Sequence, residues 1–588
     1  MIKELSDFGK PVCEQKYGEW NHVALKEEPI SIDLVIDEMG NFCKFVSVEK
    51  TTIAEALTSK KGKARLLLDK AEEVLGCGKN AKKKQQLFLD KIREYADLVE
   101  LEPVISFYEK NKINGILKAE QEFTKQFPEE KQRRGNIAFR ISGRGHRICE
   151  EPNVRNKIIN AYEHQYRKGK TCSVCGEAKY PVGDIPHGMI KHVPNGQTSG
   201  CALVSYNDSA FESYALRGNE NSSICTNCAK EYVEGMKHLL EDGTKIVNAK
   251  GKEDVIYAHR WPRKRSQNYG IDTAIVFWTR RNKELPEIDQ LETPNPADVN
   301  KLLESVSSGK EETGRYIEVD QLYSCTLSGA AARIAVRDWI ELSLYDYRKS
   351  IAQWFKDIAI IKYDKDLKNI KTYYAGLYDL SRSCQRRNSD GRYDKDDTAL
   401  ARVASNLWIA ALKNTALPLW ILTKVLQRAR LDKDGVSSER AALIKIILNR
   451  NNKGGGFVIT ENIMEGSRPI AYVCGEIFAK LESIQYFASS GERNAGIRER
   501  YFTYAMTLPA AAFGRIFDLS SKHIRKLKNE KPGLAINLDK ELQSLICDIN
   551  VLPTTFTLEE KGQFAIGYYH QRQKQFNKPI IKENGEEA

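Results

Sequence analysis

The spacing of apolar residues changes character along the chain. In the N-terminal part, apolar residues alternate with polar ones over short runs, and residues 32–48 hold two such runs around a glycine-containing turn, which predicts a β-hairpin. The runs at 137–141, 273–278 and 322–327 predict further strands. Residues 87–98 place apolar side chains mostly on one face of a predicted helix. This part of the chain is therefore expected to mix helices and strands.

From about residue 340, apolar residues recur mainly at helical spacing, as in 471–488. Pro418 and Pro509 are each placed to begin a helix. The most apolar stretch, 407–426, is interrupted by lysine, asparagine and proline, which predicts a buried helical hairpin and not a membrane span. Residues 283–312 are rich in Glu, Asp, Pro and Ser, which favours an exposed linker or a short helix.

Together these patterns predict an α+β protein. A mixed α/β N-terminal region, residues 1–400, is expected to contain an inserted four-cysteine zinc-binding segment at 172–228. A C-terminal α-helical bundle, residues 401–588, is expected to follow it. The highly charged loop from Arg382 to Asp397 is the predicted separation between the two halves.

Four of the thirteen cysteines form two Cys-x-x-Cys pairs separated by 49 residues: Cys172, Cys175, Cys225 and Cys228. Two such pairs supply the four thiolates of a closed tetrahedral zinc site, with no position left open for a substrate. The metal is therefore expected to be structural and to hold the run Gly196–Gly200 as a projection. The nine other cysteines are scattered, which favours a reduced, cytosolic protein over a disulfide framework.

The composition and the net charge indicate which class of partner to expect. The chain of 588 residues is 29% charged and 41% hydrophobic, as expected of a soluble protein with several domains. Its net charge of +12 favours a polyanionic partner, nucleic acid before an anionic membrane. The start of the chain has no apolar core of the signal-peptide type.

Three groups of polar residues, one of them the single residue Gln197, are candidates for contact with nucleic acid. The glycine-flanked loop before the helix at 87–98 carries amides and cations of the kind that contact base edges in a groove: Lys79, Asn80, Lys82 and Lys83. Gln197, in its glycine-bounded turn, is the second candidate, for a base contact or as a wedge at a duplex fork. Four arginines are candidate clamps for nucleic-acid backbone: Arg140, Arg144, Arg333 and Arg337. For each cluster the alternative is a solvated charged surface.

One enzymatic alternative comes from the histidines between the cysteine pairs. His187 and His192 loosely imitate an HNH nuclease, in which a zinc ribbon supports a catalytic metal site. However, Ala229 stands directly after the last cysteine, where that class has histidine. Nucleotide-binding and nucleophile-elbow motifs are missing from the sequence. A non-catalytic protein is therefore expected, with a zinc-stabilised scaffold without a nucleic-acid role as a further alternative.

Several runs resemble one known family, the large subunit of the type I-C CRISPR Cascade complex. The resembling runs are Gly196–Tyr214, Leu322–Trp339, Arg428–Arg430, Ala441–Arg450, Arg500–Phe502, Pro509–Phe513 and Leu558–Gln573. They are spread over most of the chain, and the last is the most specific. Two departures, Cys201 and Tyr206, fall within the first run.

The resemblance implies a non-catalytic, cytoplasmic subunit of an RNA-guided, antiviral DNA-binding complex. Such a subunit recognises the protospacer-adjacent motif in target double-stranded DNA, assists duplex opening and R-loop formation with the CRISPR RNA, and helps to recruit the helicase-nuclease. Its other implied partners are the Cascade backbone, guide-processing and small subunits. The resemblance also implies that the C-terminal bundle is small-subunit-like and is made separately by internal translation, for which Met464 is the predicted start of a product spanning 464–588.

Overall fold

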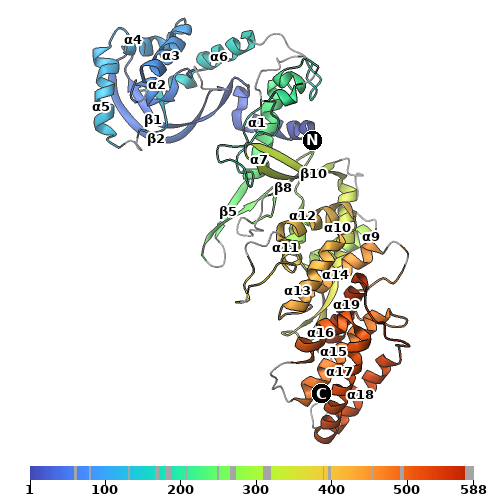
Figure 1. Ribbon diagram of the computed structural model, residues 1–588. Helices are drawn as coiled ribbons and strands as arrows, with labels where there is room; N and C mark the ends of the chain where they lie inside the picture. The colour runs from blue at the N-terminus through green and yellow to red at the C-terminus, as the bar shows by residue number, and fades with distance from the viewer. Residues whose placement is uncertain are drawn as a thin grey trace. The chain divides into compact units, whose positions relative to one another are not determined.

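The chain forms two compact units, and each is described by itself. A computed structural model describes residues 1–57, 63–78, 81–129, 133–165, 171–178, 187–206, 208–212, 214–247, 251–264, 273–308, 320–388, 390–394, 399–452, 454, 456–489 and 496–576. The first unit comprises Met1–Asp242 with the short segment Gly329–Ala335, and the second comprises Gly243–Ser328 with Val336–Ala588. Figure 1 shows the elements of both units.

The first unit is built on a four-stranded sheet with the order β2-β1-β4-β3. Its strands are β1 (Leu25–Ile36), β2 (Phe42–Glu55), β3 (Leu68–Lys70) and β4 (Asn136–Ile141). β1 and β2 form the predicted antiparallel hairpin, whose turn is closed by Asp37 accepting hydrogen bonds from the backbone N–H groups of Met39 and Asn41. β4 returns parallel to β1, so the helices between them form a crossover.

Helices cover this sheet and share its core. They are α2 (Ala71–Val74), α3 (Ala81–Glu94), α4 (Glu102–Tyr108), α5 (Lys118–Gln126) and α6 (Pro152–Gln165), with a π-helical turn at Ile113–Leu117. Phe88 and Ile92 of α3 are buried, as the helical spacing predicts. They belong to a core that includes Phe107 and Phe139.

The same unit contains a pair of long helices, α1 (Ile2–Tyr17) and α7 (Thr226–Glu241), that pack closely. Two glycines allow this approach, because a Cβ on Gly9 would lie 1.9 Å from the carbonyl oxygen of Glu231 and close to Gly235. The Ser6 hydroxyl also donates a hydrogen bond of 2.7 Å to Glu231. α7 begins at the second cysteine pair, so this packing anchors one side of the predicted metal site.

The second unit holds a sheet with the order β10-β9-β8-β7 and two separate hairpins. The strands are β5 (Gly243–Val247), β6 (Glu253–Tyr257), β7 (Arg260–Trp261), β8 (Ala274–Thr279), β9 (Gln321–Ala330), β10 (Arg333–Ser343), β11 (Ile360–Asp364) and β12 (Asn369–Tyr373). β8 is buried along its whole length, as its apolar run predicts. Helices α8 (Pro286–Glu292) and α9 (Pro296–Ser308) occupy the segment expected to be an exposed linker or a short helix, and Ile288, Leu291 and Val299 bury it in the core.

From Ala399 onward, every element of the described residues is a helix. After α10 (Leu344–Ile358) and α11 (Leu377–Arg382) come α12 (Ala399–Lys413), α13 (Leu419–Leu431), α14 (Ser438–Asn451), α15 (Ile470–Ala488), α16 (Ile497–Thr507), α17 (Pro509–Glu530), α18 (Pro532–Ile546) and α19 (Leu558–Phe576). α15 and α19 are closely packed, because Gly475 and Gly567 each leave room for a backbone carbonyl of the other helix.

The architecture confirms the predicted α+β class and the helical C-terminal region. Residues 407–426 lie in two consecutive helices, α12 and α13, but these two are not a closely packed pair, so the predicted hairpin is not confirmed. α17 begins at Pro509 as expected. In the described part of the chain, no helix combines the length and apolarity needed to cross a bilayer. The domain boundary at residue 400 and the separate translation product 464–588 are not tested by the fold, and both stay predictions.

Candidate metal centre and the turn it encloses

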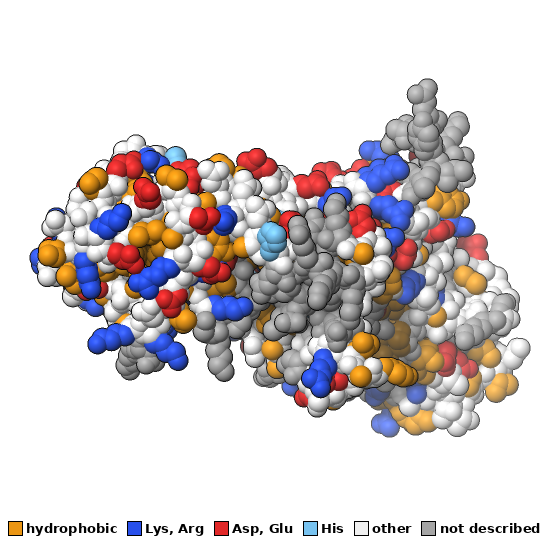
Figure 2. Space-filling model, turned by 90° about the horizontal axis from the view of Figure 1, so that it is seen from above, with side chains coloured by type: hydrophobic (Ala, Val, Ile, Leu, Met, Phe, Trp, Pro, Cys, Tyr) orange, Lys and Arg blue, Asp and Glu red, His pale blue; other side chains and the backbone are white. Residues whose placement is uncertain are grey.

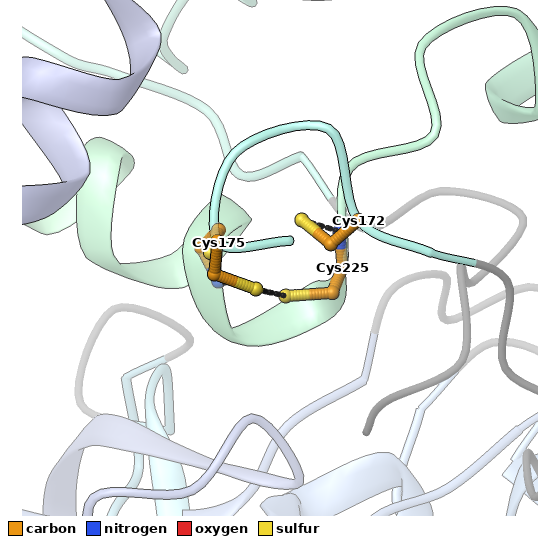
Figure 3. A group of neighbouring side chains, drawn as sticks. Cys172, Cys175 and Cys225 are labelled. Atoms are coloured by element: carbon orange, nitrogen blue, oxygen red, sulfur yellow. Dashed lines mark hydrogen bonds between the residues drawn. The ribbon is translucent and has the colours of Figure 1, made fainter. Parts of the chain in front are cut away.

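The two cysteine pairs converge, although 49 residues separate them in sequence. The sulfur atoms of Cys172, Cys175, Cys225 and Cys228 all lie within 4.8 Å of one another. The sulfurs of Cys175 and Cys225 are 3.9 Å apart and point toward each other (Figure 3). Cys172, Cys225 and Cys228 are buried, whereas Cys175 is at the surface.

Backbone N–H groups surround these sulfurs. Cys172 accepts from Val174 and Cys225 at 3.4 and 3.2 Å, and Cys225, at the N-cap of α7, accepts from Cys228 at 3.4 Å. Hydrogen bonds from the Cys228 group, above all, lower the pKa of the Cys225 thiol to about 5, while the pKa of Cys228 is raised in return. A thiolate is the metal-binding form of cysteine, so the lowered pKa favours that form at Cys225.

The geometry fits zinc. Four Zn–S bonds of about 2.3 Å in a tetrahedron place the sulfurs about 3.8 Å apart, close to the 3.9 Å between Cys175 and Cys225. With four protein thiolates, the site would be closed to substrate and would act in folding. The two knuckles are further joined by Ser173, whose N–H donates to the carbonyl of Ser223 at 2.9 Å.

The Gly196–Gly200 turn lies within the excursion that the cysteines close. Its base is a short antiparallel bridge between Ile190 and Cys201, and its end is closed by the N–H of Gly200 donating to the carbonyl of Gln197 at 2.9 Å. The Gln197 side chain is exposed. The predicted turn is therefore confirmed as a defined structure that presents this amide to solvent.

A second segment, Gly329–Ala335, holds the turn from the other side. The N–H of Gln197 donates to the carbonyl of Ala331 at 3.3 Å, and the N–H of Gly329 donates to the carbonyl of Pro194 at 2.8 Å. A Cβ on Gly329 would lie 2.4 Å from Gly196, so only glycine permits this approach. No local sequence pattern indicates this contact, because it joins residues far apart in the chain.

Arg333 extends this second segment along the same surface. Ala202 and Arg333 form a parallel bridge, and the Arg333 guanidinium lies over the ring of Phe211 at 4.7 Å from its centroid. The structure thus brings together Gln197 and Arg333, two candidates that the sequence placed in separate clusters. Arg337 lies further along β10, where its Nε donates to the Ser328 hydroxyl at 2.9 Å.

The other candidate arginines have acidic partners that the sequence did not suggest. Arg140, half-buried on β4, lies 3.7 Å from Asp33, and Arg144 lies 2.7 Å from Glu38. Arg147, in the same basic run, is buried in an ion pair with Asp33 at 2.6 Å. Contact with a phosphate would therefore compete with existing ion pairs at Arg140 and Arg144.

The lysine cluster is only partly described. Lys79 and Asn80 lie outside the described residues. Lys82 and Lys83 are exposed on the first turn of α3, and among the described residues neither forms an ion pair. The neighbouring Lys84 is bound to Glu72. The first turn of α3 holds no acidic residue, so the positive end of the helix and two lysines face solvent together.

The histidines of the nuclease alternative lie apart from the sulfur cluster. The Nδ1 atom of His187 is 2.7 Å from the Tyr232 hydroxyl of α7, and His192 lies 3.6 Å from Glu241. Neither belongs to a cluster of metal-ligating side chains within the described residues. Their positions give no support to a second, catalytic metal between the cysteine pairs.

Residues 12–576 match the family model described as CRISPR-associated protein (Cas_Csd1). The chain belongs to this family. Among curated proteins, none matches the sequence. The match extends over nearly the whole chain and includes the cysteine pairs, the Gly196–Gly200 turn and the Gly329–Ala335 segment.

The surface of this Cas_Csd1 family member is mixed in charge. Figure 2 shows Lys and Arg side chains interspersed with Asp and Glu over the described part of one face. The net charge of +12 is therefore not displayed there as one uniform basic surface. Contact with a polyanion would depend on local groups such as Lys82 and Lys83.

Proposed function

We propose that this protein is the non-catalytic large subunit of a type I-C Cascade complex. In this proposal it recognises the protospacer-adjacent motif in double-stranded target DNA and assists R-loop formation with the CRISPR RNA. It also contacts the Cascade backbone, guide-processing and small subunits and helps to recruit the helicase-nuclease. The division of labour is that the protein recognises a few base pairs while guide pairing recognises the rest.

The observation that carries the proposal is the fixed presentation of Gln197 in a CRISPR-associated chain. Its turn is held by the cysteine pairs through the chain and by Gly329–Ala335 through backbone hydrogen bonds. An exposed amide on a rigid turn has the two properties that base recognition or strand separation requires: donor and acceptor atoms, and a defined position.

The metal has a structural role in this proposal. Zinc at Cys172, Cys175, Cys225 and Cys228 would tie the ends of the excursion and so fix the position of the turn. Lys82 and Lys83 on α3, with Lys79 and Asn80 before it, would contact double-stranded DNA as a cluster independent of the Gln197 turn. Arg140, Arg144, Arg333 and Arg337 would contact nucleic-acid backbone.

Co-purification tests the assembly. The full chain, expressed with its neighbouring genes, should bring down a CRISPR RNA together with backbone and guide-processing subunits. Recovery of the chain without RNA would contradict the assignment as a Cascade subunit.

Duplex binding tests motif recognition. Gln197→Ala should reduce discrimination between target duplexes with and without the motif, whereas Thr198→Ala, an exposed neighbour in the same turn, should not. Replacing Lys82 with Ala should weaken binding to both duplexes and lower the salt slope by about 0.9. Unchanged discrimination in both the Gln197 and the Asn80→Ala variants would refute these assignments.

The alternatives make different predictions. An HNH-like nuclease would nick duplex DNA in a metal-dependent manner as a purified chain, and His187→Ala would abolish that activity. A zinc-stabilised scaffold would bind neither DNA nor RNA in a salt-sensitive manner.

A further inference from the structure

The excursion between the cysteine pairs exposes aromatic rings close to the Gln197 turn. Tyr214 is 97% exposed, the highest value among the exposed large hydrophobic residues of the described chain, and Phe211 is 38% exposed. Since three residues span at most about 11 Å, the two rings are exposed on the same short loop. Isolated exposed aromatics need no explanation, but paired rings on one loop suggest a ligand with a flat apolar face.

The backbone presents Tyr214 at a conformational cost. Tyr214 has φ of 52° and Ala215 has φ of 61°, so two consecutive residues other than glycine occupy the left-handed region. An aromatic residue is rarely found there, and such strain persists where function requires a particular direction of the side chain. With this backbone conformation the Tyr214 ring stands in solvent.

Arg333 links these rings to the segment that holds Gln197. Its guanidinium stacks on Phe211, so a cation and an aromatic face lie side by side on the surface. The same residue is bridged to Ala202, six residues from the start of the Gly196–Gly200 turn. Rings interleaved with a cation are typical of surfaces that bind single-stranded nucleic acid.

The charges on this loop favour base stacking over phosphate binding. Within three residues of Phe211 or Tyr214, or in contact with Phe211, the exposed cations Arg217 and Arg333 are matched by the exposed carboxylates Asp208 and Glu212. A site that binds phosphates needs an excess of cations, whereas stacking on a base does not. The hydroxyl and amide groups of the neighbouring turn also make the surface more polar than the centre of a protein–protein interface.

We propose that Tyr214, with Phe211 beneath Arg333, is a stacking surface for an unpaired nucleobase of a single DNA strand. This inference rests on the proposed function, in which Gln197 acts where a duplex is opened. Tyr214 would hold a base of the strand released beside that turn. The proposed stacking surface would bind single strands, in addition to the duplex motif that the protein is proposed to recognise.

The test uses the full chain and a single-stranded DNA of about 12 nucleotides that contains 2-aminopurine, whose fluorescence falls on stacking. Tyr214→Ala should weaken binding by roughly tenfold and abolish the fluorescence decrease. Tyr214→Phe should keep both, since it retains the ring. Tyr345→Ala removes a tyrosine that is 60% exposed elsewhere in the chain and is the matched control.

Salt dependence separates stacking from a phosphate contact. The slope of affinity against salt should be the same in wild type and Tyr214→Ala, because no charge is removed. Wild-type affinity and fluorescence in Tyr214→Ala would overturn the proposal, as would a Tyr214→Phe variant that behaves like Tyr214→Ala. Loss of another subunit from the complex with single-strand binding unchanged would assign the surface to protein and equally overturn it.

Two further measurements keep the result clear. Should Tyr214→Ala melt earlier than wild type, Tyr214→Leu and Tyr214→Trp decide: only the tryptophan variant should restore the fluorescence decrease. Motif discrimination is measured on fully paired duplex DNA for Tyr214→Ala and, in parallel, for Gln197→Ala. If Tyr214→Ala stacks 2-aminopurine as wild type does while Gln197→Ala loses motif discrimination, this inference alone is refuted. If Tyr214→Ala loses stacking while Gln197→Ala keeps full motif discrimination, the proposed function alone is refuted.

Discussion

Replacing Cys172 with serine should loosen the turn by removing the closure that the cysteine pairs provide. The variant removes one of four converging thiols and the sulfur that accepts hydrogen bonds from Val174 and Cys225. Zinc bound by the remaining three thiolates would be held more weakly, and the excursion of 49 residues would lose its closure. Closing a loop of this length restricts the unfolded chain by about 4 kcal/mol.

The whole of that free energy is not expected to be lost. The turn keeps its backbone hydrogen bonds to Gly329–Ala335, and α7 stays packed on α1 through Gly9 and Gly235. The first unit should therefore remain folded, with a lower melting temperature, while residues 187–206 exchange their amide hydrogens faster. Motif recognition should weaken along with stability, because Gln197 loses its fixed position.

The assay combines zinc content, thermal melting, hydrogen exchange and duplex binding on the same samples. Cys547→Ser, which changes an exposed cysteine outside the cluster, is the control and should match wild type in all four. Unchanged zinc content in Cys172→Ser would refute the metal site. Loss of zinc with faster exchange but full motif discrimination would refute the link between the metal and the turn.

Three further predictions concern the C-terminal helices. Gly475→Ala should destabilise the protein by about 1–3 kcal/mol in urea unfolding, because its Cβ would lie 2.0 Å from the carbonyl oxygen of Phe564. Gly514→Ala, with open space around it in a helix, should stabilise by about 0.5–1 kcal/mol, and the opposite order would show that the packing of α15 on α19 is wrong. Burial raises the pKa of Glu476 from 4.5 to about 7, so the native state holds a proton that the unfolded chain releases in that range, and this contribution to stability is lost as pH rises. The stability of Glu476→Gln relative to wild type should therefore rise by up to about 3 kcal/mol between pH 4.5 and pH 8, whereas a difference independent of pH would contradict the shift. Met464→Ile should abolish a separate product of 125 residues without affecting the full chain, and a short product that persists would refute Met464 as an internal start.

Local pattern predicted the elements and the convergence of the four cysteines well, for a physical reason. Alternation in residues 32–48 and the apolar run at 273–278 depend only on which face of a strand is buried, so the sequence carries them directly. The cysteine pairs are also local, since each Cys-x-x-Cys knuckle is complete within four residues. For the segment 283–312, the polar composition left an exposed linker and a short helix both open, because it concealed the few apolar residues that bury α8 and α9.

Electrostatic roles could not be predicted in the same way. The run that contains Arg140, Arg144 and Arg147 has no acidic residue of its own, which suggested a surface for phosphate. In the folded chain, Asp33 and Glu38 come from the β1–β2 hairpin and pair with these arginines. The pairing depends on the parallel register of β1 with β4, and no local pattern contains that register.

The most specific consequence of the fold is that Gln197 and Arg333 should act together. Each belongs to a run that resembles the same family, yet 135 residues separate them in sequence. The backbone hydrogen bonds from Gln197 to Ala331 and from Ala202 to Ala332 place both on one surface. A rigid connection of this kind makes the effects of two substitutions non-additive when both side chains contact one ligand. In a double-mutant cycle on target-duplex binding, Gln197→Ala and Arg333→Ala should therefore show a coupling free energy of about 0.5–3 kcal/mol, whereas Gln197→Ala and Lys82→Ala should be additive. Additivity in both cycles would mean that the shared surface does not bind the target as one site.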